Sequence, residues 1–403
     1  VNSNEVETQL VGGANVEIAT GAGGAGGGNI TWDAGAPIDY SGSTNSLTLD
    51  AHGYIYLKSD ITTGSGGLIL EAGAGYVQSD GITLTLNGPL DIATGDATIG
   101  TTGFTSPQFA ATLVGSQNLT KSGNGRLILS GNSNTWSGTA NVQGGTLRVS
   151  GNNALGTGTS TNVLSGATLE IDGVISIGEN IELFSGSTLK NWSGNNTITL
   201  PVLLRENGSR VIEIRQGNLT LNPSAGNAIS ADNNVVADLT LAGSGDLLVQ
   251  GIVDLDNGQV PATYGDLSQT GTGVARFKDS IIADQVESTG GGTIWMDQPG
   301  GLSVALPSTT SISLNNGSVL RRDSSETVTG INLSLGAGGG GISVGNGFTL
   351  DWNSAIAGAG TFTKAGDGTL RFASTANITY SGSTFVNGGR LDVLSSSPIS
   401  ATC

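Results

Sequence analysis

The chain has 403 residues, of which 67 are glycine, and its 15 basic residues are outnumbered by 32 acidic residues, which gives a net charge of −17. The glycines follow no Gly-X-Y period, which excludes collagen, and the apolar residues are too frequent and too regularly alternating for a disordered tract. The acidic balance disfavours nucleic acid and anionic lipid as partners, because both carry phosphate charge.

Cys403 is the only cysteine, so an intramolecular disulfide is excluded. We interpret this residue as a chain boundary, with an intermolecular link as the alternative. The first residues, VNSNEVETQL, show no basic stretch followed by an apolar one, so no signal peptide is predicted. No apolar run is long enough to cross a membrane as a helix. We therefore expect a mature or interior part of a longer protein, which reaches a membrane only through an anchor or translocator missing from the chain.

Residues 1–100 are predicted to form short strands separated by Gly, Asn, Asp and Ser. The strand segments include NVEIAT, GNITWD, NSLTLDAHGYIYLK, GGLILEAG and GITLTLNGPLDIAT. Apolar residues recur in them at every second position, which is the period of a strand with one buried face. This series resembles the interior of filamentous-haemagglutinin-like exoproteins, which are the substrates of two-partner secretion.

The only histidine, His52, lies in the stretch LTLDAHGYIYLK. Alternation places it with Asp50 on the face opposite Leu49 and Ala51. Asp50 and His52 could act as an acid/base pair. The polar outer face of an ordinary strand is the better-supported interpretation, because such pairs are a weak signal.

Tyr54 and Tyr56 follow His52 with the same period. If Ile55 points inward, both rings point outward, beside His52 and Lys58. An exposed aromatic stripe offers flat faces on which sugars can stack. The alternative, that the rings pack under a loop or a neighbouring strand, is the commoner arrangement. His52, Tyr54 and Tyr56 are therefore the candidate surface contact for a glycan or for a cell-surface or matrix partner.

Residues 101–118, TTGFTSPQFAATLVGSQN, interrupt the alternation with two phenylalanines and a proline. We predict an irregular excursion there, either a protruding loop or a lateral strand. The chain is accordingly divided into a first β-segment over residues 1–100, the excursion over 101–118, and a second β-segment over 119–403.

Two copies of one motif begin at residues 119 and 362. They are LTKSGNGRLILSGNSNTWSGTANVQGGTLRVSGNNALG over 119–156 and FTKAGDGTLRFASTANITYSGSTFVNGGRLDVLSSSPI over 362–399. Both contain Thr-Lys, Gly-x-Gly, an aromatic residue before Ser-Gly, and Gly-Gly followed by Leu-x-Val. The glycines permit tight corners, and each short strand has one apolar face. One such turn cannot bury that face alone, whereas stacked turns bury a continuous apolar row.

The repeat predicts an all-β chain, folded as an elongated, right-handed parallel β-helix. Within the first copy, Leu147 is expected to point into the core and Arg148 outward into solvent. Arg205, Arg210 and Arg215 are spaced by five, fit no single strand face, and are also expected to be solvated.

The residues that the two copies share resemble the passenger-associated transport repeat of autotransporters. Together the copies cover about a fifth of the chain. The resemblance implies a passenger exported by a type V pathway, located outside the cell at the bacterial surface and associated with the outer membrane. It also fits the missing disulfides, because a passenger crosses the outer membrane unfolded.

No catalytic, cofactor-binding or metal-binding residues are predicted. A nucleophile elbow is absent, one histidine and one terminal cysteine are too few for a zinc site, and the nine-residue calcium repeat does not occur. The run GAGGGG at residues 336–341 is followed by no helical pattern, so we interpret it as a corner and not as a phosphate-binding loop.

Because the sequence offers so few candidate catalytic residues, we favour a structural and adhesive function. The chain would be the stalk of a secreted or cell-surface bacterial exoprotein that contacts cells, matrix or other copies of itself. One alternative is a β-helical polysaccharide-degrading enzyme, which would need clustered carboxylates in a groove and a basic residue on an adjacent coil. The other is an exoprotein that binds a nutrient of the haem type, which the single histidine disfavours.

Overall fold

The computed structural model describes residues 2–22, 27–73, 75–95, 108–131, 134–255, 265–298, 300–302, 306–307 and 311–394. Cys403 and the first part of the predicted excursion, residues 101–107, lie outside these ranges. The chain forms two compact units, Val1–Leu189 and Lys190–Cys403. Within each unit the strands pair in parallel from one turn of the chain to the next. The predicted all-β solenoid is confirmed.

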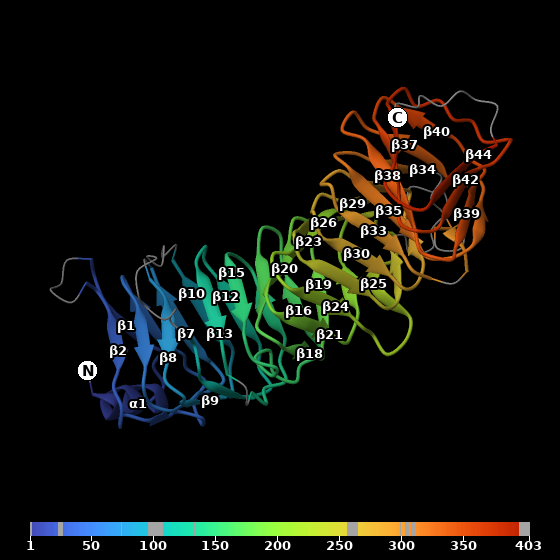
Figure 1. Cartoon of the computed structure of the whole chain (residues 1–403). Coiled ribbons are helices and arrows are strands. Elements are labelled where there is room, and N and C mark those ends of the chain that lie inside the picture. The colour runs from blue at the N-terminus through green and yellow to red at the C-terminus, as the bar shows by residue number, and fades with distance from the viewer. Residues whose placement is uncertain are drawn as a thin grey trace. The chain divides into compact units, whose positions relative to one another are not determined.

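In the first unit, strands from successive turns lie side by side (blue to green in Figure 1). One side consists of β1 (Val16–Ala19), β4 (Leu47–Ala51), β7 (Leu68–Ala72), β10 (Leu90–Thr94), β12 (Leu119–Ser122), β14 (Ala140–Val142), β16 (Ser160–Val163) and β19 (Asn180–Leu183). A second side consists of β2 (Ile30–Trp32), β5 (Ile55–Leu57) and β8 (Val77–Ser79), and then β13 (Arg126–Leu129), β15 (Thr146–Val149) and β17 (Thr168–Asp172). The remaining strands are β3 (Ile38–Asp39), β6 (Ile61–Thr62), β9 (Thr83–Leu86) and β11 (Thr112–Gly115), which form one sheet, and β18 (Ser176–Ile177), which is the first strand of another.

The second unit is built in the same way, and β20 (Thr188–Ser193) spans the boundary between the two units. One group of strands is β22 (Val202–Leu204), β25 (Asn227–Ala231), β28 (Ile252–Asp254) and β31 (Ile281–Ile282). A second group is β23 (Gly208–Ile214), β26 (Ala237–Gly243), β29 (Leu267–Gln269), β32 (Gln285–Ser288), β34 (Ser311–Leu314), β37 (Asn332–Leu335) and β40 (Ile356–Gly358). A third is β21 (Asn195–Ile198), β24 (Asn218–Leu221), β27 (Asp246–Val249), β30 (Val274–Phe277), β33 (Thr293–Met296), β35 (Ser318–Arg322), β38 (Gly340–Val344), β41 (Phe362–Ala365) and β43 (Thr384–Val386). The last is β36 (Glu326–Val328), β39 (Thr349–Trp352), β42 (Thr369–Phe372) and β44 (Arg390–Val393).

Rows of apolar side chains hold neighbouring turns together. Leu47 pairs in register with Leu68, Leu68 with Leu90, and Leu90 with Leu119, and all four side chains are fully buried. Neighbouring strands lie roughly 4.8 Å apart, so each leucine contacts its counterparts above and below. Each such side chain contributes about 1.5–3 kcal/mol of apolar burial.

The interval between β10 and β12 contains the predicted excursion. The described part of this segment includes β11, which pairs in register with β9, with Leu113 opposite Leu84. Leu113 is fully buried, like the leucines of the regular turns. Residues 112–115 therefore form an ordinary strand, and the division at 101–118 stays a prediction.

Strand alternation does not predict α1 (Ser3–Val11), which lies against the first turns of its unit (Figure 1). Its apolar residues Val6 and Leu10 are buried. The carbonyl oxygen of Leu10 accepts hydrogen bonds from Ser43 Oγ at 2.6 Å and from Asn45 Nδ2 at 2.7 Å. The helix thus covers apolar surface that the first turn would otherwise expose. No helix in the described part of the chain is long and apolar enough to cross a membrane.

The lysine of the first repeat copy lies inside the solenoid. Lys121 has no exposed surface. Its Nζ donates hydrogen bonds to the carbonyl oxygens of Ser122 at 2.5 Å, Gly123 at 3.1 Å and Gly144 at 3.2 Å. Gly123 has a φ of 71°, the left-handed region in which a side chain is strained. The Gly-x-Gly and Gly-Gly elements of the motif therefore form corners whose carbonyl groups turn toward the ammonium.

The second copy repeats this arrangement. Lys364 is fully buried, and its Nζ donates to the carbonyl oxygens of Ala365 at 2.7 Å, Gly366 at 2.6 Å and Gly388 at 3.0 Å. The φ of Gly366 is also 71°. The sequence resemblance between the copies thus corresponds to the same buried polar contact in each unit.

The expected exposure of Arg148 is wrong, although its strand register is right. Leu147 is fully buried, and Arg148 points to the other side of β15. Arg148 is nevertheless only 8% exposed, because its guanidinium contacts the carboxylate of its register partner Glu170 at 2.7 Å and that of Asp172 at 3.3 Å. An acidic residue on the next turn removes this outward side chain from solvent.

The expectation of three solvated arginines is also wrong at one position. Arg210 is fully buried, and its guanidinium donates to the carbonyl oxygens of Arg205, Glu206 and Gly208. It occupies the inward-facing register of β23, where alternation alone predicts an apolar residue. Arg215 is exposed, as expected.

Candidate functional site

The structure places His52, Tyr54 and Tyr56 on the outer surface of the first unit. The intervening Ile55 is fully buried, as is Leu57. Because successive residues of a strand point to opposite sides, the tyrosine rings face outward. His52 is exposed, and the two tyrosines are partly exposed. The role of these residues in binding stays a prediction.

A third tyrosine, which the sequence analysis does not identify, joins this surface. β5 pairs with β8 so that Ile55 lies opposite Val77. This register places Tyr76 directly beside Tyr54, and the two rings stack with centroids 5.2 Å apart and planes 5° from parallel. The signal in the sequence is the interval of 22 residues between them, which matches the length of one turn in this part of the chain.

Tyr56 is already engaged by neighbouring charged groups. Its hydroxyl donates a hydrogen bond to the carboxylate of Asp80, and this bond is the main reason why the pKa of Tyr56 lies above its ordinary value. The Nζ atom of Lys58 lies 4.7 Å from the centroid of the Tyr56 ring. One ring face is thus occupied by a cation. We therefore define the stacked pair Tyr54 and Tyr76, with Tyr56 beside it, as the tyrosine surface.

Asp50 and His52 do not form the acid/base pair that the sequence allows. Within the described residues, no hydrogen bond or ion pair joins them. Asp50 instead lines a hollow of about 480 Å³ together with Glu71, which is its register partner on the next turn. The described residues that line this hollow include no lysine, arginine or histidine. The described part of the chain also contains no group of three or more His, Cys, Asp or Glu residues that could hold a metal ion.

Comparison with known proteins connects the repeat copies to a family. The family model described as passenger-associated-transport-repeat matches residues 119–149 and 362–393. The chain is also 28% identical, in an alignment 394 positions long, to the adhesin BmaC autotransporter of Brucella suis biovar 1 (strain 1330). These two findings support an autotransporter passenger.

The alignment with the Brucella adhesin covers 81% of the passenger segment but only 11% of the adhesin. No solved structure matches the passenger significantly. An autotransporter passenger is secreted and stays associated with the outer membrane, so these findings imply a location at the bacterial cell surface. The family matches lie outside residues 1–100, so the filamentous-haemagglutinin-like resemblance of that part stays a prediction.

The matched repeats contribute to the interior of the passenger and not to its tyrosine surface. The aromatic residue of each motif copy is buried: Trp136 in the first and Tyr380 in the second. The Tyr380 hydroxyl forms a hydrogen bond with Thr384. Because the shared motif residues include glycines at corners, a buried aromatic residue and a buried lysine, the repeat indicates the fold of the passenger without identifying a ligand.

Proposed function

We propose that the passenger is an adhesive β-solenoid stalk that contacts cells or extracellular matrix through its outer face. The similarity to a protein named an adhesin supports this function, and so does the solenoid of parallel turns. The observation that carries the proposal is the tyrosine surface. It places two stacked, partly exposed rings directly before the paired strands β5 and β8, where a sugar ring or an apolar side chain can lie against them.

Contacts of this kind are individually weak. An aromatic pair is worth about 0.5–1.5 kcal/mol beyond its burial, so a single tyrosine surface gives low affinity. Many passengers displayed on one bacterium engage a surface together, and the combined avidity exceeds that of each contact. Adhesion would therefore depend on the density of display.

The test is a double substitution, Tyr54→Ser with Tyr76→Ser, in the chain displayed on beads. Binding of the beads to epithelial cell monolayers and to an array of printed glycans is measured by fluorescence. We expect the double variant to lose most of the bead binding while its far-ultraviolet circular dichroism stays unchanged. The matched control is Phe385→Ser, which removes an exposed aromatic ring from the second unit. Equal binding by the double variant and the unmodified chain would contradict a role for this surface.

A polysaccharide-degrading enzyme is the second candidate, favoured by the adjacent carboxylates of Asp50 and Glu71 in one hollow. Paired carboxylates are the usual catalytic groups of glycoside hydrolysis. The purified chain is incubated with plant, bacterial and animal polysaccharides, and reducing ends are measured. Cleavage that Asp50→Asn abolishes without unfolding the chain would establish the enzyme and overturn the purely adhesive function.

A further inference from the structure

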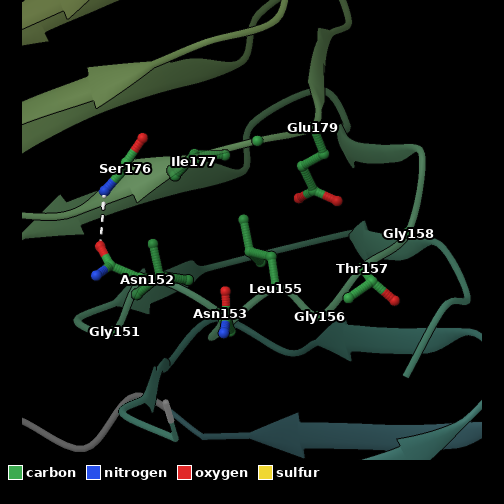
Figure 2. A pocket seen from close by; sticks show the side chains of 12 residues that line it. Gly151, Asn152, Asn153, Leu155, Gly156, Thr157, Gly158, Ser176, Ile177 and Glu179 are labelled. Carbon is green, nitrogen blue, oxygen red and sulfur yellow. Dashed lines mark hydrogen bonds between the residues drawn. The ribbon is translucent and has the colours of Figure 1, made fainter. Parts of the chain in front are cut away.

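A cavity of about 360 Å³ lies in the first unit, between the connection that follows β15 and the connection that follows β17. Its mouth contains the exposed residues Asn152, Thr157 and Ser176, and its floor contains the buried residues Leu155 and Ile177. Figure 2 shows Glu179 on the far side, with its carboxylate pointing into the space beside Leu155. This volume falls in the range of small-molecule sites.

The cavity results from a local mismatch between two stacked turns. Val149 pairs with Ile171, and Thr161 pairs with Ile181, so the connection in the second turn is two residues shorter than in the first. The connection between Ile171 and Ile181 is therefore too short to cover the whole connection between Val149 and Thr161, and a space remains between them. The backbone N–H of Ser176 also finds no strand carbonyl here and donates instead to Asn152 Oδ1 at 2.8 Å (Figure 2). That bond fixes the Asn152 side chain at the mouth.

Glu179 is an unusual residue for a solenoid interior, since it is only 5% exposed. Its Oε1 accepts a hydrogen bond from the Thr161 hydroxyl, and no other partner of this carboxylate exists within the described residues. Burial raises the pKa of the Glu179 carboxyl to about 7, although the hydrogen bond from Thr161 opposes this. Desolvation of a carboxylate is costly unless a cation or further hydrogen bonds compensate it. The carboxylate thus lacks a counter-ion and faces a cavity large enough to admit one.

We infer that this cavity binds a small ligand through a primary ammonium group, with Glu179 as the counter-ion. The ammonium would contact the Glu179 carboxylate, while the amide of Asn152 and the hydroxyl of Thr157 lie at the mouth to receive polar groups of the ligand. A primary ammonium has three donors, which suits a site rich in oxygen acceptors. The inference is independent of the proposed adhesive function, because the cavity is lined by none of the tyrosines.

Other ligand classes fit the cavity less well. Glu179 is the only titratable residue among those that line it, so no basic group is present for an anion. One carboxylate is too few for calcium, which takes 6–8 oxygen ligands. A neutral sugar would leave the carboxylate without a counter-ion, and no aromatic ring lines the cavity for stacking.

The test compares each amine with a hydroxyl analogue of the same shape. Glucosamine is compared with glucose, and cadaverine with 1,5-pentanediol, by nuclear magnetic resonance titration of the whole chain. We expect both amines to bind and both alcohols to bind at least about tenfold more weakly, since one charge-assisted contact accounts for such a factor. The two amines represent two classes of ligand with a primary ammonium group. Stronger binding of glucosamine assigns the site to amino sugars, and stronger binding of cadaverine assigns it to linear amines.

Two further measurements separate binding from structure. Glu179→Gln should weaken cadaverine binding at least about tenfold, whereas Glu17→Gln, which removes an exposed carboxylate outside the cavity, should have little effect. Because the carboxyl must be ionised to pair with the amine, cadaverine binding by the unmodified chain should increase about tenfold from pH 6 to pH 8. If Glu179→Gln does not fold, carboxyl resonances of the unmodified chain still report whether cadaverine lowers the pKa of Glu179. Equal binding of amines and alcohols, or an unchanged Glu179 pKa with excess cadaverine, would overturn the inference.

Discussion

At the scale of single residues, the interior of this solenoid holds charges that are compensated by backbone groups. The ammonium groups of Lys121 and Lys364 each donate to three carbonyl oxygens at glycine corners. Burial lowers the pKa of Lys121 to about 8 and also lowers the pKa of Lys364. Burial therefore makes the charged form of each lysine less favourable. The ammonium nevertheless supplies hydrogen-bond donors to corner carbonyl groups that would otherwise be buried without a partner.

Replacement of Lys121 by methionine should destabilise the first unit. Methionine keeps most of the side-chain volume but leaves the carbonyl groups of Ser122, Gly123 and Gly144 without their donor. Each buried unsatisfied group costs about 1–3 kcal/mol, and we expect a loss of about 2–4 kcal/mol in urea unfolding. Lys58→Met, on the partly exposed outer face, is the control and should change stability little. A Lys121→Met chain as stable as its parent would show that water replaces the ammonium.

Glu179 should make the stability of the first unit depend on pH. Its pKa is raised from 4.5 to about 7 in the folded chain, so between these values the folded state keeps a proton that the unfolded state releases. Stability from this group is therefore greatest below about pH 4.5 and falls as the pH rises to about 7. At about 1.4 kcal/mol per pKa unit, the change is on the order of 3 kcal/mol.

The measurement is the difference in unfolding free energy between the unmodified chain and Glu179→Gln at a series of pH values. As the pH increases from 4.5 to about 7, the unmodified chain should lose stability relative to the glutamine variant. Glu17→Gln, at an exposed position, should give a difference that is nearly constant. A constant difference for Glu179→Gln as well would mean that the carboxyl titrates like a solvated one.

At the scale of elements, alternation along a strand sets the direction of a side chain, while the next turn sets its exposure. Leu147 and Arg148 are neighbours on β15, and both are buried, one in the core and one against Glu170. Arg126 lies on the preceding turn, 3.3 Å from the same Glu170 carboxylate. The outer face of this strand group thus carries an ion-pair network across three turns.

Substitutions at both neighbours should therefore destabilise the chain, for different reasons. Leu147→Asp buries an unpaired charge in the core and should cost several kcal/mol or prevent folding. Arg148→Ala leaves Glu170 with only Arg126 and should cost about 2–4 kcal/mol, slightly less than a fully buried pair. Arg390→Ala, whose side chain is 73% exposed, is the control and should cost less than about 0.5 kcal/mol. Thermal unfolding of the three variants measures how much stability each substitution costs. If Arg148→Ala is as stable as the unmodified chain, the ion-pair network does not contribute to stability.

At the scale of the whole molecule, each compact unit contains one copy of the transport repeat. The first copy lies in Val1–Leu189 and the second in Lys190–Cys403. In a solenoid each turn contacts mainly its neighbours, so stability accumulates locally. The two units therefore each possess a core and a buried lysine of their own.

Urea unfolding of the chain should consequently depart from a single two-state transition. We expect two transitions, monitored by circular dichroism and by tryptophan fluorescence, because each unit contains a buried tryptophan, Trp136 in the first and Trp352 in the second. Lys121→Met should shift one transition and Lys364→Met the other. A single transition that both substitutions shift equally would show that the chain unfolds as one cooperative unit.

Much of this protein follows from the sequence alone. Alternating apolar residues, glycine corners and two copies of one motif are local features, and they predict the parallel solenoid and the passenger family. They also predict the outward direction of Tyr54 and Tyr56, because a strand has a period of two. Local geometry determines these properties, so no distant residue has to be known.

The tertiary structure decided the properties that depend on which turn lies against which. The stack of Tyr54 on Tyr76, the burial of Arg148 by Glu170, and the cavity beside Glu179 all involve residues about 20 apart in the sequence. Turn lengths vary along the described chain, from 19 residues between Leu267 and Val286 to 31 between Val16 and Leu47. Because the number of residues per turn changes along the chain, the sequence alone does not predict which residues pair between neighbouring turns. Exposure, charge compensation and cavities are set by those partners, and so they appear only once the turns are stacked.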